Sequence, residues 1–288
     1  MTRSAADAAP AARLAARSLL YELSVTPKPG LVDRANNGAH KDMDFFTFID
    51  SSLSLLPFFK SCVKTGFKQA ERPDDELFSM LRPDGILAEK LMLKSTKGVN
   101  THKGAIFSLG LICASIGRIQ AFGDPMYETR VCSEVEKLAK YSLSDYELKP
   151  LDGLATGGEL AFAKFKITGA RGEAASGFWG VLNIALPELR RQLKLGRTIN
   201  DAGLYALLSL MSFTDDTNVV KRSGRQTLKD MQDQAKNILR QDIINIDEVE
   251  NLDKDLIEKN ISPGGCADLL AITYFLYFLS SEPDLLDF

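Results

Sequence analysis

The sequence predicts an all-α fold, and three patterns along the chain support this prediction. Apolar residues recur at steps of three and four positions, as in Ile106, Leu109, Ile112, Ile116 and Ile119, which is the spacing of one helix face. Runs that alternate between apolar and polar residues, typical of strands, are scarce. Gly and Pro stand between the helical segments. Because no long linker or repeat interrupts the chain, we expect one globular multi-helix domain over residues 1–288.

The first five predicted helices follow from apolar spacing between turn-forming residues. An Ala- and Arg-rich start runs into the first helix, so we expect the first ten residues to fray. Phe45 begins the apolar stripe of the second helix, in which Pro57 should kink the chain or end a turn. Pro73 and Gly98 bound the next helix. The five helices are expected over residues 7–25, 43–66, 75–95, 103–121 and 126–142.

Six further helices are predicted in the second half of the chain. Gly224 separates two of them, and Pro187 should disturb another. The acidic stretch 242–255 is typical of a solvated helix face. Ser262 is the expected N-cap of the last helix, with Pro263 at its first position. The six helices are expected over residues 152–165, 175–194, 199–212, 225–241, 247–259 and 266–281.

Composition excludes several classes of protein. A net charge of -3 gives no reason to expect nucleic acid as a partner, so any anionic ligand must be met by local cations. The longest apolar run, residues 269–279, is shorter than the about 20 residues that cross a bilayer. The 4 cysteines form no CxxC pair, so we expect buried free thiols in a reducing compartment. These features predict a cytoplasmic protein that binds neither nucleic acid nor membranes.

Polar, Gly-rich sequence is concentrated in five clusters, and Glu22 precedes the first of them, residues 26–42. Two prolines flank and stiffen Lys28, and Gly30 permits close backbone approach. Lys28 and Arg34 could bind oxyanions. An ordinary helix–helix loop, with Asp42 or Asp44 as helix cap, would explain the same composition. The other polar side chains that could bind substrate or Mg²⁺ here are Asp33, Asn36, His40 and Asp42.

The second cluster, residues 97–104, lies directly before a strongly apolar helix. Backbone N–H groups at a helix N-terminus attract anions, and Lys103 would add positive charge. Asn100 could bind substrate there or cap the helix instead. The chain has 2 histidines, and both lie in these first two clusters, as His40 and His102. Imidazoles among cations and carboxylates indicate a site.

The third and fifth clusters also join glycines to charged residues. In residues 169–177, Arg171 and Glu173 could form a ligand clamp, a buried pair, or a surface pair on a glycine-rich turn. In residues 262–268, Asp268 is a charge at the start of an otherwise apolar helix. Such a charge requires a partner, which could be a metal, an arginine or a ligand.

The fourth cluster, residues 214–222, contains the adjacent carboxylates Asp215 and Asp216, followed by Asn218 and Arg222. Adjacent carboxylates suit a hard cation that bridges phosphates, although one of them could simply cap the following helix. Taken together, the five clusters interleave cations and carboxylates at helix junctions. This composition predicts a site for a polyphosphate with Mg²⁺ between helix ends.

The same clusters resemble the triphosphoribosyl-dephospho-coenzyme A synthases. The similarity runs from about residue 13 to residue 281, and Trp179 stands where the family often has proline. The stretches that carry it are TPKPGLVDRANNGAHKDM, GVNTHKGAIFSLG, GARGEAASGF, DTNVVKR and SPGGCADLLA.

The resemblance implies an all-α, Mg²⁺-dependent pentosyltransferase. ATP would lose adenine, and the ribose 2′-hydroxyl of 3′-dephospho-CoA would attack C1′ of the ATP ribose. The product would be the precursor of the prosthetic group on the acyl carrier subunit of citrate lyase or, in a related branch, of malonate decarboxylase. Expected partners are the acyl carrier protein and its prosthetic-group transferase, and a homodimer is allowed.

Chemistry and resemblance together suggest a role for each candidate residue. A displacement at an anomeric carbon gains from carboxylate charge and from protonation of the leaving base. Glu22, His102 and Glu173 are alternative acid/base groups. Phosphates are assigned to Lys28, Arg34, Lys103, Arg171 and Arg222, and Mg²⁺ to Asp33, Asp42, Asp215 and Asp216. Further substrate contacts are expected at Gly30, Asn36, His40, Asn100, Asn218 and Asp268.

Two other functions fit parts of the pattern. A metal-dependent α-helical hydrolase of nucleotides or ADP-ribosyl groups would share the Asp-rich helix junctions. A helical adaptor that docks a carrier protein would instead expose apolar stripes, whereas the polar signal here lies at the helix junctions.

Overall fold

Helices make up the whole regular structure of the described residues. The computed structural model describes residues 7–144 and 157–282, and these ranges contain no β-strand, which confirms the all-α prediction. The helices are α1 (Ala9–Ser24), α2 (Phe45–Ser54), α3 (Leu56–Lys68), α4 (Asp74–Ser95), α5 (Lys103–Phe122), α6 (Glu128–Ala139), η1 (Lys140–Ser142), α8 (Gly157–Phe165), α9 (Gly169–Ala175), η2 (Val181–Ala185), α10 (Leu186–Lys194), α11 (Ile199–Met211), α12 (Thr217–Leu239), α13 (Ile246–Glu258) and α14 (Gly264–Ser281).

Proline and side-chain caps explain where helix boundaries differ from the predicted ones. The helix predicted over residues 43–66 is two helices, because the chain breaks at Leu55, two residues before Pro57. The helix predicted from residue 225 begins at Thr217, since Asp216 caps it there. Gly224 does interrupt it, with φ 85° inside α12.

The helix predicted over residues 175–194 is interrupted at residues 176–178. The third cluster, for which a glycine-rich turn was one alternative, contains the short helix α9, and a π-helical turn η2 follows before α10 begins ahead of Pro187. Part of two other predictions lies outside the described residues: the frayed start at residues 1–6 and residues 152–156 of the predicted helix 152–165.

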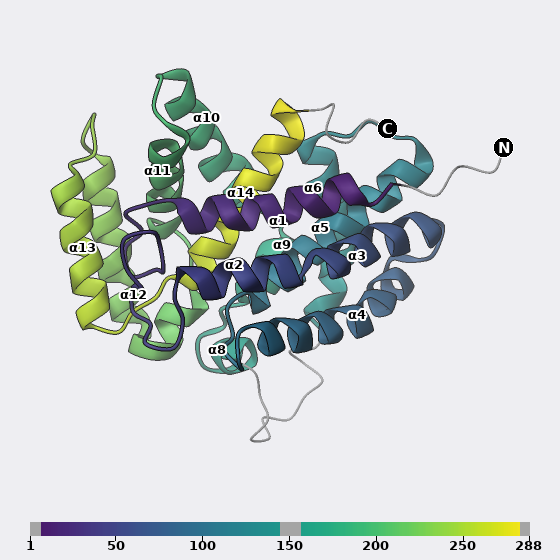
Figure 1. The fold of residues 1–288 in the computed structure, drawn as a ribbon, viewed down its shortest axis with the longest axis horizontal. Helices are drawn as coiled ribbons and strands as arrows, with labels where there is room; N and C mark the ends of the chain where they lie inside the picture. Colours follow the sequence, from purple (N-terminus) through teal and green to yellow (C-terminus); the bar gives the residue numbers. More distant parts are fainter. Residues whose placement is uncertain (1–6, 145–156, 283–288) are drawn as a thin grey trace.

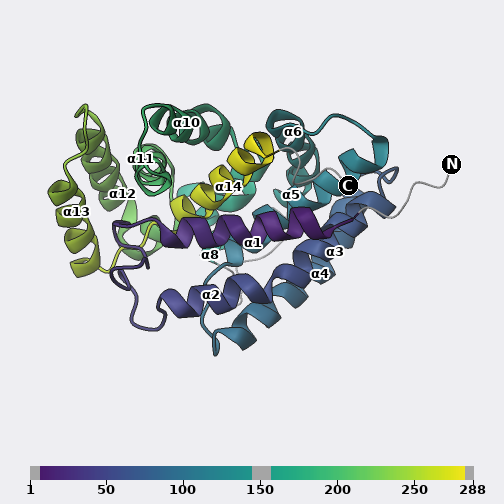
Figure 2. The same cartoon turned by 45° about the horizontal axis from the view of Figure 1, so that its top comes forward.

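Three helices that are buried on most sides form the centre of the molecule: α5, α11 and α14. In Figure 1, α14 crosses behind α1 in the middle of the molecule, and in the turned view of Figure 2 it lies above α1. By length and composition, α5 and α14 could cross a membrane, but 72% and 61% of their apolar windows are buried inside the protein. These two helices therefore serve as the core around which the others pack.

Small residues allow α3 and α5 to pack backbone against backbone. A Cβ on Gly66 of α3 would lie 1.9 Å from the carbonyl oxygen of Ala114. A Cβ on Gly117 of α5 would lie 2.0 Å from the carbonyl oxygen of Val63. Because neither backbone can move without disturbing its helix, only glycine fits at both positions.

The four cysteines are buried free thiols, as the sequence predicts. Burial raises the pKa of each of them, most mildly that of Cys132, to about 12. They are therefore protonated and unreactive at neutral pH.

Candidate functional site

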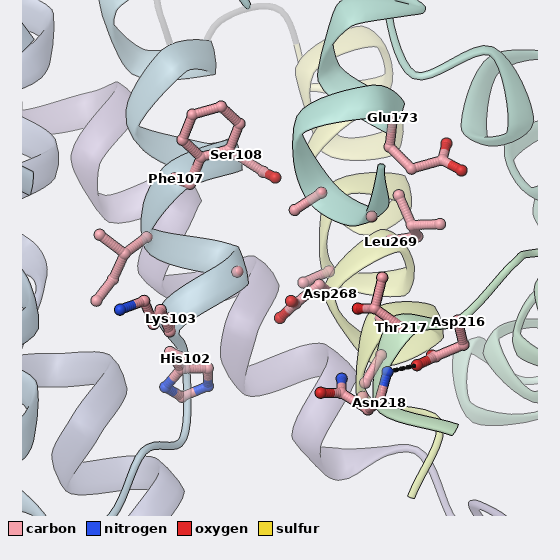
Figure 3. A pocket seen from close by; sticks show the side chains of 18 of the residues that line it. His102, Lys103, Phe107, Ser108, Glu173, Asp216, Thr217, Asn218, Asp268 and Leu269 are labelled. Atoms are coloured by element: carbon pink, nitrogen blue, oxygen red, sulfur yellow. Dashed lines mark hydrogen bonds between the residues drawn. The ribbon is translucent and has the colours of Figure 1, made fainter. Parts of the chain in front are cut away.

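A cavity of about 1180 Å³ opens where the N-terminal ends of α5, α9, α12 and α14 meet. Figure 3 shows His102 and Lys103 at the start of α5, with Asp268 on α14 and Glu173 on α9 around the same space. The volume exceeds the roughly 300–1,000 Å³ typical of a pocket for one small ligand. Helix N-termini carry partial positive charge and unpaired N–H groups, so this convergence favours a large anionic ligand.

Most of the residues that the sequence predicts for the site surround this cavity, although they come from five separate clusters. Fourteen of the eighteen line it: Glu22, Lys28, His40, Asp42, Asn100, His102, Lys103, Arg171, Glu173, Asp215, Asp216, Asn218, Arg222 and Asp268.

The four other predicted residues lie in the first cluster and shape its loop. Asp33 accepts hydrogen bonds from the backbone N–H groups of Lys28 and of two residues within its own turn. The Gly30 N–H and the Asn36 side chain both donate to Asp253 of α13. Arg34 donates to the side chain of Asn200. Their polar atoms thus hold the loop together, and none of the four lines the cavity.

Asp216 caps two helices at once. Its Oδ1 accepts from the N–H groups of Asn218, at 2.8 Å, and Val219, at 3.3 Å, in the first turn of α12. Its Oδ2 accepts from the N–H of Cys266 in α14, at 3.0 Å. A Cβ on Gly265 would lie 2.9 Å from that same oxygen, so the glycine lets the two helix ends approach. Asp216 therefore joins the fourth cluster to the fifth.

The start of α14 differs from the prediction. Pro263, and not Ser262, stands at the N-cap position, and no side chain of its own caps this helix. The hydroxyl of Ser262 instead lies 2.9 Å from Nε2 of His40. The expected cap is replaced because Asp216, from another helix, already accepts from the first turn of α14. Of Asp42 and Asp44, the two alternative caps expected after the first cluster, Asp44 is the one that caps α2.

A buried ion pair lies beside the cavity. Nζ of Lys28 donates to Oε1 of Glu22, and both side chains are almost wholly buried. Burial raises the pKa of Glu22, and the positive charge of Lys28 opposes this effect. Since Lys28 is paired with Glu22, the two side chains together bring no net charge to the cavity wall.

His102 is buried at the cavity wall. Its Nδ1 lies 2.7 Å from the hydroxyl of Ser51, and the edge of its ring meets Phe48 at 5.0 Å. Its Nε2 is buried and has no hydrogen-bond partner. Burial, with a smaller contribution from the charge of Lys28, lowers the pKa of His102 to about 3. The imidazole is therefore neutral at physiological pH.

His40 is more open to solvent than His102. Burial lowers its pKa, and the nearby charge of Arg222 lowers it further, while Asp42 opposes the shift. Its Nδ1 lies 3.9 Å from a carboxylate oxygen of Asp42. His40 thus connects the first cluster to Ser262 in the fifth.

Asp268 faces the N-terminus of α5 across the cavity. A Cβ on Gly104 would lie 2.0 Å from its Oδ2, so an alanine there would displace the carboxylate. Burial raises the pKa of Asp268 well above its usual range, and the charges of Glu22 and Asp216 raise it further. The N–H of Ala105 opposes this by donating to the carboxylate. The partner that the sequence required for Asp268 is thus a helix N-terminus.

Carboxylates at the other side of the cavity are less firmly tied to the backbone. Burial raises the pKa of Glu173, and the charge of Asp215 raises it further. Asp215 itself is exposed. Among the described residues, no group of three or more His, Cys, Asp or Glu side chains is arranged to hold a metal ion by itself. A cation here would need ligands from a bound substrate.

Several cations of the cavity lie outside the predicted set. Lys166, Arg82 and Lys221 also line it. Lys166 has φ 59° and directly follows α8, three residues before Gly169, where the third cluster begins. The only sequence signal for Lys166 was its place beside that cluster. Of the predicted cations, Lys103 pairs with Glu89 at 2.8 Å.

Comparison with known proteins places this geometry in a family. The sequence profile of the ATP:dephospho-CoA triphosphoribosyl transferases matches residues 8–285. A Pectobacterium atrosepticum protein named 2-(5''-triphosphoribosyl)-3'-dephosphocoenzyme-A synthase is 44% identical, and the match covers 93% of this chain and 88% of that protein. A Vibrio cholerae protein named as a probable synthase of the same kind is 43% identical, with 92% and 87% covered.

A solved structure supports the fold. The crystal structure of a candidate triphosphoribosyl-dephospho-CoA synthase from Archaeoglobus fulgidus matches with a TM-score of 0.52 and 19% identity, over 79% of this chain and 96% of that one. The profile and the close relatives identify a transferase that acts on ATP and dephospho-CoA. The chain therefore belongs to the ATP:dephospho-CoA triphosphoribosyl transferase family.

Proposed function

We propose that the protein transfers the 5-triphosphoribosyl group of ATP to the ribose 2′-hydroxyl of 3′-dephospho-CoA and releases adenine. The observation that carries this proposal is the large cavity at which four helices begin. Its volume suits two nucleotides at once, and direct transfer from one to the other requires that both are bound together.

The triphosphate would bind among the cations that line the cavity. Seven cations line the cavity, and they supply the local positive charge that the net charge of the chain does not. Four of them come from two parts of the chain: Lys166 and Arg171 lie just before and within α9, and Lys221 and Arg222 lie in α12. Guanidinium groups suit phosphate oxygens because they donate two parallel hydrogen bonds.

Asp268 suits the departure of adenine. Burial and the charges of Glu22 and Asp216 raise the pKa of Asp268 well above the usual range of a carboxyl group, which favours protonation of this group. A protonated carboxyl group can donate a hydrogen bond to a ring nitrogen of the leaving base. The ionised carboxylates around the cavity would stabilise the positive charge that develops on the ribose at C1′.

Mg²⁺ would be held by Glu173 and Asp215 together with substrate phosphates. This fits the donor set, because Mg²⁺ keeps several waters and usually takes only one or two carboxylates in addition to phosphates. The charge of Asp215 raises the pKa of Glu173, because the two carboxylates repel each other, and a cation bound by both would relieve this repulsion. Asp33 and Asp216 are weaker candidates, since backbone N–H groups already occupy their oxygens. When bound, the ion would neutralise phosphate charge.

The product would serve as the precursor of the acyl carrier prosthetic group of citrate lyase or malonate decarboxylase. The carrier protein and its prosthetic-group transferase would act after this step. A cytoplasmic location suits these soluble substrates, and the four protonated cysteines fit a reducing compartment.

Product analysis tests the proposal. Incubation with ATP, Mg²⁺ and dephospho-CoA should give free adenine and a dephospho-CoA derivative heavier by one triphosphoribosyl group, both detected by mass spectrometry. Coenzyme A, whose ribose carries a 3′-phosphate, should be a poor acceptor. Ribose phosphates without the larger CoA derivative would indicate a hydrolase and reject the proposal.

A further inference from the structure

We infer that Ser51 and Thr101 form a hydroxyl relay that lets His102 take the proton of the attacking 2′-hydroxyl. This inference rests on the proposed transfer to that hydroxyl. It assigns functions to two residues that are not among the acid/base and metal candidates described above.

The relay is a continuous chain of short contacts. Nδ1 of His102 lies 2.7 Å from Oγ of Ser51, which lies 2.6 Å from Oγ1 of Thr101. Ser51 and His102 are buried, whereas Thr101 is half-buried and lines the cavity. The residues at both ends of the chain, His102 and Thr101, thus line the cavity, and the relay takes Nε2 of His102 as the atom that meets substrate.

The unpaired Nε2 is the feature that points to a ligand. A buried polar atom without a partner loses its hydrogen bonds to water, so native proteins rarely keep one without a reason. His102 is 3% exposed and lines the cavity, and Figure 3 shows its ring at the start of α5. A substrate hydroxyl at this position would supply the missing partner.

The electrostatics around His102 explain why a relay is needed. Lys28 adds positive charge and Phe48 covers one side of the ring, so a positively charged imidazolium is strongly disfavoured. A histidine of this kind is a weak base if it must hold two protons at once. It can accept a proton at Nε2 only if it loses the proton on Nδ1 in the same event.

The proton transfers balance along the chain. In the resting state Nδ1–H of His102 donates to Ser51, whose hydroxyl donates to Thr101, whose hydroxyl donates to cavity water. As the substrate oxygen bonds to C1′ and adenine leaves, the substrate proton moves to Nε2. The Nδ1 proton moves to Ser51, the Ser51 proton to Thr101, and the Thr101 proton passes through cavity water to the departing base, which leaves as neutral adenine. Each relay group gains one proton and loses one, and after product release the reverse transfer through water restores the resting state.

The chain supplies a matched control for Ser51. Ser52 is the next residue of α2 and is equally buried, but its hydroxyl donates to the carbonyl oxygen of Phe48 in its own helix at 2.8 Å. Ser51→Ala and Ser52→Ala therefore remove the same atom from the same helix at the same depth. Only the first change interrupts the contact to His102.

Kinetics of these variants test the relay. Ser51→Ala should lower kcat at least about tenfold with KM nearly unchanged, because acid–base groups contribute roughly 10²–10⁴-fold. Thr101→Val should do the same, and Thr101→Ser should restore most of the rate. Ser52→Ala should keep the wild-type kcat. Equal kcat values for Ser51→Ala and Ser52→Ala would overturn the relay, whereas a wild-type protein that releases no adenine would instead reject the proposed function.

Nitrogen NMR gives a second test, which measures the nitrogen that carries the ring proton of His102. A purely structural role of Ser51 would not change that position. With only 2 histidines in the chain, ¹⁵N-histidine labelling of a His40→Asn variant leaves His102 as the single signal source. Near pH 7 the ring should be neutral with its proton on Nδ1, and Ser51→Ala should shift the tautomer balance. A ring protonated on Nε2 in the resting protein, or a balance that Ser51→Ala leaves unchanged, would contradict the relay.

Discussion

At the scale of single residues, the site depends on polar groups whose partners come from distant parts of the chain. Asp216 caps α12 and α14 together, and Ser262 leaves its expected capping position to contact His40. Asp268 meets the N-terminus of α5 in place of a metal or an arginine. Each of these contacts joins two of the five clusters, so local sequence alone could not predict it.

The buried pair of Glu22 and Lys28 gives a prediction for stability. Lys28→Met should reduce the free energy of unfolding by about 3–5 kcal/mol, because it leaves a buried carboxylate without its partner. The double variant Glu22→Gln/Lys28→Met should recover most of this loss, since it removes the charge as well. Urea unfolding of the two variants measures both effects, and a double variant no more stable than the single one would refute this account.

His102 gives a prediction for pH. Its pKa in the folded protein is about 3, below the roughly 6.5 of an unfolded histidine, so below pH 6.5 the unfolded chain takes up a proton that the folded protein does not. Its contribution to stability therefore falls as the pH falls, by about 1.4 kcal/mol per unit. The unfolding free energy of wild type relative to His102→Gln should drop by about 2–3 kcal/mol between pH 7 and pH 4.5. A difference that does not change with pH would show that His102 titrates normally.

At the scale of helices, most of the fold could be predicted from spacing, and the exceptions have physical causes. The helices α5 and α14 are apolar nearly all round because they are buried, so their pattern is unambiguous. The short helix α9 was missed because Gly169 and Gly172 are typical of turns. In the structure these glycines make room for the side chains of Thr217 and Thr168, contacts that no local pattern reveals.

The glycines between α3 and α5 give a prediction at this scale. Gly66→Ala would force a methyl group against the Ala114 carbonyl oxygen, so it should destabilise the protein by about 1–3 kcal/mol or more. Gly85 lies in helix α4 with no atom within 4 Å of a Cβ. Gly85→Ala should therefore stabilise the protein by about 0.5–1 kcal/mol. Thermal unfolding compares the two, and equal melting temperatures would contradict the close packing of α3 and α5.

At the scale of the whole molecule, the fold gathers five separate clusters around one cavity. The sequence could predict that they carry the site, because each lies at a junction next to a helix and combines glycines with charge. In the first cluster, Asp33 bonds within its own loop and Asn36 bonds to Asp253 of α13, and neither lines the cavity. The sequence did not single out Arg82 of α4 or Lys166, which directly follows α8, although both line the cavity.

The cavity is electrically balanced despite its high charge. Seven cations and seven carboxylates line it, so bound phosphates meet positive charge while the reacting ribose can still meet negative charge. The cations are Lys28, Arg82, Lys103, Lys166, Arg171, Lys221 and Arg222, and the carboxylates are Glu22, Asp42, Glu89, Glu173, Asp215, Asp216 and Asp268. This arrangement suits a transfer in which both nucleotides occupy the cavity together.

Adenine release measured against both substrate concentrations tests that claim most directly. If both nucleotides must occupy the cavity before transfer, ATP alone should give no adenine. Double-reciprocal plots at several dephospho-CoA concentrations should then intersect, with one adenine released per molecule of product. Adenine release from ATP alone, together with parallel plots, would show that the two substrates react in turn and would contradict the account.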